Sequence, residues 1–211
     1  MIKKKDFIEI TYTGTLENTN QVFDTTDEKV AKDSNIYNEN MTYGPIIICV
    51  GENQILPGID KELLDKDFKS YTITLTPENA FGKKNPKLLQ LLSQNSFKKQ
   101  NITPYPGLQI NIDDMMGIVR TVTPGRVIVD FNHLLAGKTL TYKIKILKEI
   151  KDPKQQLDSL LIFYAKDIKS EIRDSTATII SKSLPKEVQK DLTKKITTLI
   201  PNIKKLTIKK E

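Results

Sequence analysis

The stretch TYTGTLENTNQVFDTT, residues 11–26, carries three signals in a row. Apolar and polar residues alternate up to Leu16, which is the period of a strand with one buried face. The sequence Glu-Asn-Thr-Asn follows and predicts a tight turn. The chain then places the ring of Phe23 directly before the carboxyl group of Asp24. We therefore predict a strand, a turn and a returning strand that sets an aromatic ring beside a carboxylate.

Segments on both sides of this stretch also have strand character. The strand-like runs are DFIEITYTGT (6–15), IIICVG (46–51), KSYTITLTPENAFG (69–82) and LTYKIKILKEIK (140–151). Between the second and third runs the period changes, because Pro57 stands near a helix start and Ile59, Leu63 and Leu64 form a short apolar stripe. The pattern predicts an antiparallel sheet with one short helix.

Residues 83–130 are too many for a loop inside a compact domain. They contain the strand-like pieces GLQINI, GIVRTV and RVIVDF, which predict an inserted all-β subdomain. Its first part, residues 83–99, holds five lysines and no acid together with several large apolar residues. The apolar residues either form the core of the subdomain or belong to an apolar, basic surface that binds unfolded chains. The candidates for client binding are Leu88, Leu89, Leu92 and Phe97.

After Pro153 the composition changes, and the chain shows two helix-like segments, a hairpin pattern around residues 173–175 and a closing basic edge strand. Apolar residues at 157, 160, 161 and 164 have the spacing of one helical face, and so do those at 188, 192, 196 and 199. Residues 152–211 therefore predict a small α/β domain. Such a domain is marginally stable alone by size. We expect it to dock on another surface or to self-associate, with a homodimer through this domain as one form of that association.

Composition excludes several classes of protein. The chain has 211 residues, 38% hydrophobic and 28% charged, and no apolar run approaches the ~18–20 residues of a membrane span. The start MIKKKDFIEI soon alternates between apolar and polar residues, unlike a signal peptide, so we expect a cytoplasmic protein.

The net charge is +7, and most of the surplus of positive charge lies after residue 150. The lysines there are spread over amphipathic segments, which favours a solvated surface over binding to nucleic acid.

Three familiar kinds of site are missing from the sequence: a glycine-rich phosphate loop, a Cys/His metal cluster and a Ser-His-Asp arrangement. One histidine cannot build a metal site, so we expect no metal and no cofactor. The chain offers instead a set of apolar and aromatic residues at the ends of predicted strands. These are Tyr12, Phe23, Ile46, Ile55, Leu56, Ile59, Phe81 and Tyr142. On pattern alone, most of them would be ordinary core residues.

The order and spacing of four blocks resemble the FKBP-type peptidyl-prolyl isomerases. The blocks are TYTGTLENTNQVFDTT, VGENQILPGIDKELL, LTPENAFG and DFNHLLAGKTLTYKIKIL. More narrowly, the chain is similar to the SlyD-like branch, in which a chaperone subdomain interrupts the flap and the chain re-enters through an Asn-His-x-Leu-Ala-Gly motif, here residues 132–137. The resemblance covers about residues 1–150, and the tail is similar to the extension of the long archaeal members.

This resemblance implies an α+β fold with a bent antiparallel FKBP-like sheet around a short helix. It implies a discontinuous catalytic domain of residues 1–83 and 131–151. The chaperone subdomain would span residues 84–130, and the C-terminal α/β domain residues 152–211.

The resemblance also implies the residues of a pocket between sheet and helix. The catalytic candidates are Tyr12, Phe23, Asp24, Leu56, Phe81 and Tyr142. The substrate-binding candidates are Ile46, Ile55, Ile59, His133, Leu134 and Leu135. The backbone N–H of Leu56 would bind a substrate carbonyl. Phe81 stands where the family usually has Tyr, so one hydroxyl is missing, and Tyr142 replaces the usual Phe.

The activity implied is acceleration of Xaa-Pro rotation in unfolded or nascent polypeptides, with the inserted subdomain holding these clients. No nucleophile is needed, because no covalent bond breaks. The alternative is a holdase without enzymatic activity, in which the isomerase site is weakened. Binding of RNA by the basic tail is a third hypothesis.

Overall fold

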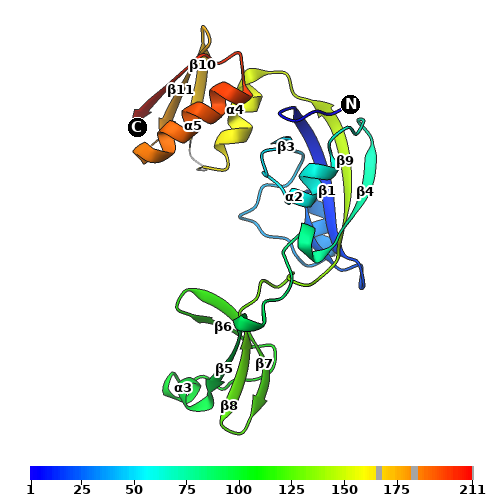
Figure 1. Cartoon of the computed structure of the whole chain (residues 1–211), viewed down its shortest axis with the longest axis vertical. Coiled ribbons are helices and arrows are strands. Elements are labelled where there is room, and N and C mark those ends of the chain that lie inside the picture. The colour runs from blue at the N-terminus through cyan, green and yellow to red at the C-terminus, as the bar shows by residue number, and fades with distance from the viewer. Residues whose placement is uncertain (165–167, 182–184, 211) are drawn as a thin grey trace. The chain divides into compact units, whose positions relative to one another are not determined.

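The computed structural model describes residues 1–164, 168–181 and 185–210, with the side chains of 186, 187 and 210 left aside. The chain forms two compact units (Figure 1). The first consists of Met1–Leu75 and Leu140–Glu211, and the second of Thr76–Thr139. The fold class is α+β, as the sequence predicts.

The first unit is built on an antiparallel main sheet. Its strands are β1 (Phe7–Leu16), β2 (Val22–Thr25), β3 (Ile46–Cys49), β4 (Ser70–Leu75) and β9 (Leu140–Glu149). Their order is β2-β1-β9-β4, and β3 pairs with β1 beyond the end of β2. The alternation noted in the sequence places one row of side chains on the inner face, where β1, β9 and β4 pair Gly14 with Tyr142 and Tyr142 with Ile73. This row positions the aromatic residues of the candidate site.

Two short helices accompany this sheet, α1 (Glu28–Asp33) and α2 (Pro57–Glu62). Proline at the first position starts α2, where no backbone N–H partner is lost. Helix α2 packs against β4 and buries Ile59. It ends at Glu62, one residue before the buried Leu63, so the predicted apolar stripe extends past the helix.

The second unit contains a four-stranded antiparallel sheet. Its strands are β5 (Leu89–Ser93), β6 (Gln109–Ile112), β7 (Met115–Thr123) and β8 (Arg126–Asp130), in the order β5-β8-β7-β6. The single-turn helices are η1 (Pro77–Asn79) and η2 (Pro86–Leu88). The predicted all-β subdomain also contains a helix, α3 (Gln94–Lys99), which Ser93 caps through its side chain. Residues 94–99 have no helical period of apolar residues, because α3 buries only Phe97.

The tail forms α4 (Pro153–Leu161), β10 (Lys169–Arg173), β11 (Thr176–Ser181), α5 (Lys186–Leu199) and β12 (Lys205–Lys210). Strands β10 and β11 make a hairpin, and α5 crosses over to bring β12 parallel to β11. Helix α4 ends at Leu161, and Tyr164, predicted on its buried face, is 37% exposed.

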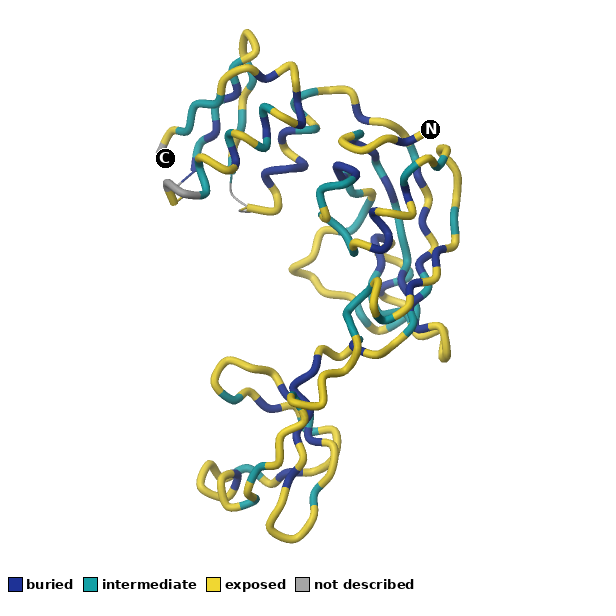
Figure 2. Tube along the Cα trace, in the orientation of Figure 1, coloured by how far each residue is buried: buried dark blue, intermediate teal, exposed yellow. Residues whose placement is uncertain are grey.

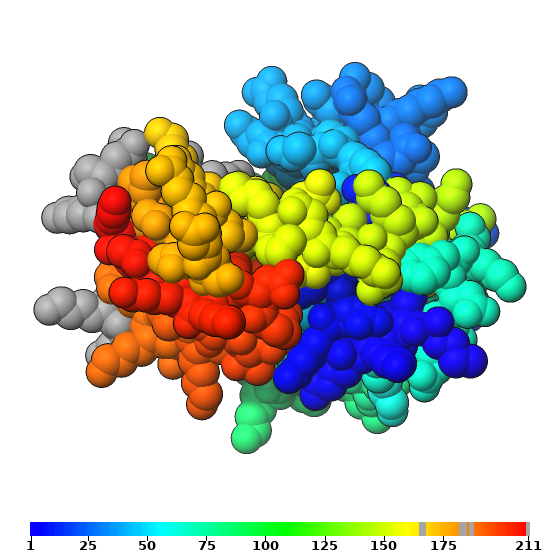
Figure 3. All heavy atoms as spheres, turned by 90° about the horizontal axis from the view of Figure 1, so that it is seen from above, coloured from blue at the N-terminus to red at the C-terminus, as the bar shows by residue number. Residues whose placement is uncertain are grey.

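The tail shares one hydrophobic core with the main sheet, which Figure 2 shows as buried segments on both sides of their contact. Phe7, Cys49 and Ile150 of the sheet region pack in one cluster with residues of α4, α5 and β11. In Figure 3 the atoms of the C-terminal segment, orange to red, lie directly against those of the N-terminal strand, in blue. An ion pair of 3.0 Å between Lys195 and Glu52 bridges the same contact. The tail therefore belongs to the first compact unit.

Within the part of the chain that the structure describes, no helix combines the length and the apolar character needed to cross a bilayer.

Candidate active site

Three aromatic rings meet on the inner face of the main sheet. Phe23 contacts Tyr142 edge-on, with ring centroids 5.7 Å apart, and Tyr12 lies on Tyr142 at 5.8 Å. Gly14 makes this approach possible, because a Cβ there would lie 2.8 Å from Cζ of Phe23 and 2.9 Å from Cε1 of Tyr142. We call Tyr12, Phe23 and Tyr142 the aromatic cage.

Asp24 is tied to the cage by a hydrogen bond that the hydroxyl of Tyr12 donates to Oδ2, at 3.1 Å. The hairpin of β1 and β2 sets this pair, since Asp24 lies opposite Gly14 in register. Thr26 secures the hairpin, because the N–H of Tyr12 donates to its Oγ1 at 2.9 Å. The carboxylate therefore has one fixed orientation beside the rings.

Burial changes the protonation behaviour of these groups. It raises the pKa of Asp24 above its ordinary value, although hydrogen bonds from Tyr12 and Thr25 act in the opposite direction. Burial, followed by the charge of Asp24, also raises the pKa of Tyr12 and of Tyr142 well above the ordinary value for tyrosine. Both tyrosines thus keep their protons at neutral pH and remain hydrogen-bond donors.

The hydroxyl of Tyr142 donates to no residue in the described part of the chain. The residue is only 3% exposed, yet its oxygen is not sealed from solvent. Tyr142 therefore presents a donor that a bound ligand can use.

A second donor lies at the start of α2. Leu56 is the N-cap residue, and its N–H has no acceptor among the described residues. The loop before it is held rigidly, because Asp60 accepts the N–H groups of Gly51 and Asn53 at 2.8 and 3.0 Å. The oxygen of the Gln54 side chain accepts the N–H of Cys49 at 2.6 Å. This loop holds the N–H of Leu56 in place.

The remaining candidates of the first unit differ in exposure. Ile55 and Leu56 are half-buried, whereas Ile59 is buried. Ile46 is half-buried at the start of β3, opposite Ile10.

Four candidates belong to the second unit. Phe81 stacks on His133 with ring centroids 4.3 Å apart. The N–H of Leu135 donates to Nδ1 of His133 at 3.2 Å. His133 and Leu134 are exposed, and Leu135 is half-buried. The stacked pair of Phe81 and His133 therefore lies at the surface and not in the core.

The four candidates for client binding do not share one surface. Phe97 is 4% exposed and belongs to the core of the insert, with Leu88 and Leu92 packed against it. Only Leu89 is exposed. The opposite face of the sheet carries the accessible apolar side chains, which we call the open face: Leu89, Leu91, Met116, Ile118 and Ile128.

Most of the open face could not be predicted from the sequence, because β5 is a nearly continuous run of leucines. Its pairing with β8 separates them, since Leu92 lies opposite the buried Val127 and Leu91 opposite the exposed Ile128. The alternation of side chains along RVIVD, residues 126–130, could have indicated that Ile128 lies on the face opposite to Val127 and Val129.

The polar face of the main sheet also has a hollow, with a volume of about 660 Å³. Thr11, Lys143 and Lys145 line it together with Tyr43, Pro45 and Tyr71, and Tyr12 is the only cage residue at its wall. Among the described residues, no three His, Cys, Asp or Glu side chains gather as a metal site would require.

Comparison with known proteins supports this organisation. The family described as "FKBP26, IF domain" matches residues 90–135. A short-type peptidyl-prolyl cis-trans isomerase of Methanocaldococcus jannaschii is 32% identical over 147 residues, covering 69% of this chain and 92% of that protein. A probable FKBP-type 16 kDa peptidyl-prolyl cis-trans isomerase of Pseudomonas fluorescens is 36% identical over 109 residues, 49% of this chain and 71% of that protein. The isomerase SlyD of Helicobacter pylori is 29% identical over 118 residues, 54% of this chain and 64% of that protein.

The archaeal relative aligns over nearly its whole length, and the matched IF family falls on the four-stranded sheet of the second unit. The resemblance inferred from the four sequence blocks is therefore confirmed. The chain belongs to the FKBP-type peptidyl-prolyl cis-trans isomerases and carries an insert-in-flap domain, which relates it to SlyD and to the archaeal short-type isomerases.

Proposed function

We propose that the chain accelerates rotation about Xaa-Pro bonds in folding proteins, and that the open face of its insert binds these clients. The observation that carries the proposal is the hydrogen bond from Tyr12 to Asp24 beside the rings of Phe23 and Tyr142. It supplies an oriented carboxylate in an apolar setting, which suits a reaction that breaks no covalent bond.

The barrier to be lowered comes from amide resonance. That resonance gives the C–N bond partial double-bond character and a rotational barrier of ~18–20 kcal/mol. In the twisted transition state the resonance is lost, so the carbonyl is less polar. A cage that excludes water therefore favours the twisted amide over the planar, hydrated one. A thousandfold acceleration requires only about 4 kcal/mol.

Each group of the site has a role in this mechanism. The rings of Phe23 and Tyr142 exclude water from the rotating bond. The N–H of Leu56 binds a client carbonyl, and the hydroxyl of Tyr142 offers a second donor. Asp24 orients the client backbone. Further contacts with the client come from the remaining candidates of the first unit: Ile46, Ile55 and Ile59.

Substitutions in the cage test the isomerase function. Asp24→Ala and Phe23→Ala should each lower kcat/KM for a prolyl tetrapeptide by about tenfold or more, which corresponds to ~1.4 kcal/mol of lost transition-state stabilisation. Thr11→Ala is the matched control, because Thr11 lies on β1, the strand that pairs with β2, and lines the hollow on the polar face instead. Full activity of both cage variants, with the fold intact by circular dichroism, would remove these residues from the mechanism.

The client-binding role rests on the open face of the insert. Leu91 is 60% exposed and lies opposite Ile128 across the pair of β5 and β8, so the two side chains form a contiguous apolar surface. An unfolded chain covers such a surface with its own apolar residues, and burial of that area drives the binding.

A double substitution, Leu91→Ser with Ile128→Ser, tests this surface. It should abolish most of the suppression of aggregation of an unfolded protein and leave tetrapeptide turnover unchanged. Tyr105→Ser removes an equally exposed apolar residue of the insert outside its strands and is the control. Suppression by the wild-type chain without any tetrapeptide turnover would instead indicate the holdase.

A further inference from the structure

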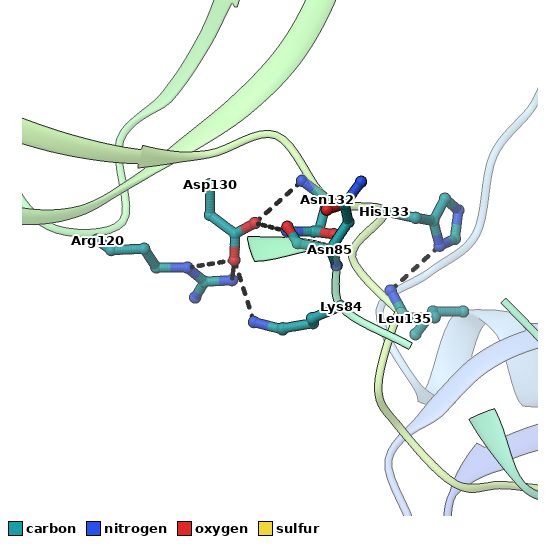
Figure 4. Close-up of polar contacts among 7 residues, drawn as sticks. All are labelled: Lys84, Asn85, Arg120, Asp130, Asn132, His133 and Leu135. Atoms are coloured by element: carbon teal, nitrogen blue, oxygen red, sulfur yellow. Dashed lines mark hydrogen bonds and ion pairs between the residues drawn. The ribbon is translucent and has the colours of Figure 1, made fainter. Parts of the chain in front are cut away.

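The insert is joined to the rest of the chain by an entry segment around Lys84 and Asn85 and an exit segment that begins after β8. Asp130, the last residue of β8, lies between them with a side chain only 1% exposed. Figure 4 shows that donors from three segments converge on this single carboxylate.

The two carboxylate oxygens of Asp130 accept hydrogen bonds from different partners. Oδ2 accepts hydrogen bonds from Nζ of Lys84 at 3.0 Å and from Nε of Arg120 at 3.1 Å, and it forms an ion pair with Nη2 of Arg120 at 3.0 Å. Oδ1 accepts from the backbone N–H of Asn132 at 3.0 Å and from its Nδ2 at 2.8 Å. Asn132 in turn holds Asn85 in both directions, accepting its N–H at 2.7 Å and donating Nδ2–H to its carbonyl at 3.1 Å. We call these five residues the clamp.

The buried charge of Asp130 favours the arrangement in which all its donors stay in contact with it. Burial by itself would raise the pKa of Asp130, but the donors of Asn132, Lys84 and Arg120 hold that pKa well below its ordinary value. A buried ion pair adds little net stability compared with apolar packing, whereas removal of one partner leaves an uncompensated buried charge. The carboxylate therefore fixes which segments meet, and at what distance.

The clamp also lies between two features of the second unit. Asp130 is paired in register with Leu89 and Ile118 of the open face. On its other side, Asn132 directly precedes His133, which stacks on Phe81. Arg120 occupies the irregularity of β7, where the register shifts, and so departs from the regular ladder to reach the clamp.

We propose that Asp130, acting through Arg120 and Asn132, is a positioning residue that locks the entry and exit segments of the insert into one joint, and that catalysed refolding of a client held on the open face depends on this joint. This inference rests on the proposed function. A loose joint would weaken the coupling between client binding and isomerisation. A tetrapeptide, which does not need the open face, would be unaffected.

The experiment compares Arg120→Met with Arg126→Met. Arg126 lies on β8, is exposed, and makes no ion pair with any described residue, so its substitution removes the same charge without touching the clamp. Arg120→Met should lower catalysed refolding of a proline-limited protein roughly threefold or more. Its tetrapeptide turnover should equal that of the wild type, as should both activities of Arg126→Met. Arg120→Lys, which restores the charge, should recover part of the loss.

Hydrogen exchange reports on the joint directly. The amides of Asn85 and Asn132 should exchange faster in Arg120→Met, because their acceptors belong to the clamp. The amides of Val127 and Val129 should keep their protection if the sheet is intact. Should the sheet lose protection, Lys84→Met takes the place of Arg120→Met with the same criteria.

Unchanged refolding despite faster exchange at Asn85 and Asn132 would overturn the inference, and so would unchanged exchange at both. Failure of the proposed function is a separate result, namely absence of tetrapeptide turnover in the wild type.

Discussion

Gly14 sets the spacing of the aromatic cage, because its missing side chain is where two rings converge. Gly14→Ala would place a Cβ under 3 Å from Phe23 and Tyr142, so at least one ring must move. We expect kcat/KM for a prolyl tetrapeptide to fall by about tenfold, a loss of ~1.4 kcal/mol. Unfolding should also become easier, by roughly 1–3 kcal/mol for an overpacked core. Wild-type turnover in this variant would show that the cage spacing is irrelevant to the reaction.

Asp24 is expected to weaken the fold that it serves. Burial raises its pKa, so the neutral carboxylic acid costs the fold nothing below the ordinary Asp pKa of about 3.9, and the carboxylate that forms as the pH rises through the folded-state pKa lowers the stability. Asp24→Asn keeps an acceptor for Tyr12 and removes the charge. The variant should resist urea better than the wild type at pH 7 and equally well at pH 3, while losing turnover. An equal difference at both pH values would contradict this account.

Some residues of the site could be predicted from the sequence and others could not. The Phe23–Asp24 pair is adjacent in the chain and stands out beside its turn. The partner of Asp24 is Tyr12, and that contact depends on the register that places Asp24 opposite Gly14. Asp130 was missed for the same reason, since its partner Lys84 lies 46 residues away in the chain.

Among the elements, strands with one buried face were predicted well. In β1, β4 and β9 polar and apolar residues alternate, and the alternation identifies the residues of the inner face. The insert was harder, because residues 88–92 contain four leucines that fit neither a strand period nor a helix period. Only the pairing of β5 with β8 decides which of them face solvent.

Helix α5 connects the tail to the main sheet through its buried side chains. Leu192 is fully buried in the core that also contains Phe7 and Cys49. Leu192→Ala should lower the free energy of unfolding by about 2–5 kcal/mol, as for other large-to-small core changes. Lys194→Ala, an exposed position on the same helix, should change it by less than about 0.5 kcal/mol. Thermal unfolding followed by circular dichroism measures both, and similar losses in the two variants would argue against a shared core.

At the scale of the whole molecule, the fold class and the family could be predicted because four blocks recur in a specific order. The shared core of tail and sheet could not be placed in this way, because apolar periodicity shows that a helix has a buried face but not what covers it. Removal of residues 152–211 would uncover Phe7, Cys49 and Ile150. We expect such a truncated chain to unfold at a lower temperature and to aggregate, as light scattering would show. A truncated chain as stable as the full one would contradict the shared core.

The lone thiol of Cys49 makes that contact open to chemical measurement. It is 1% exposed, and burial raises its pKa to about 12, so it should resist alkylating reagents while the tail stays docked. Each transient separation of the tail would expose the sulfur, and the rate of maleimide labelling would count those separations. A single native cysteine thus reports how often the tail and the main sheet separate.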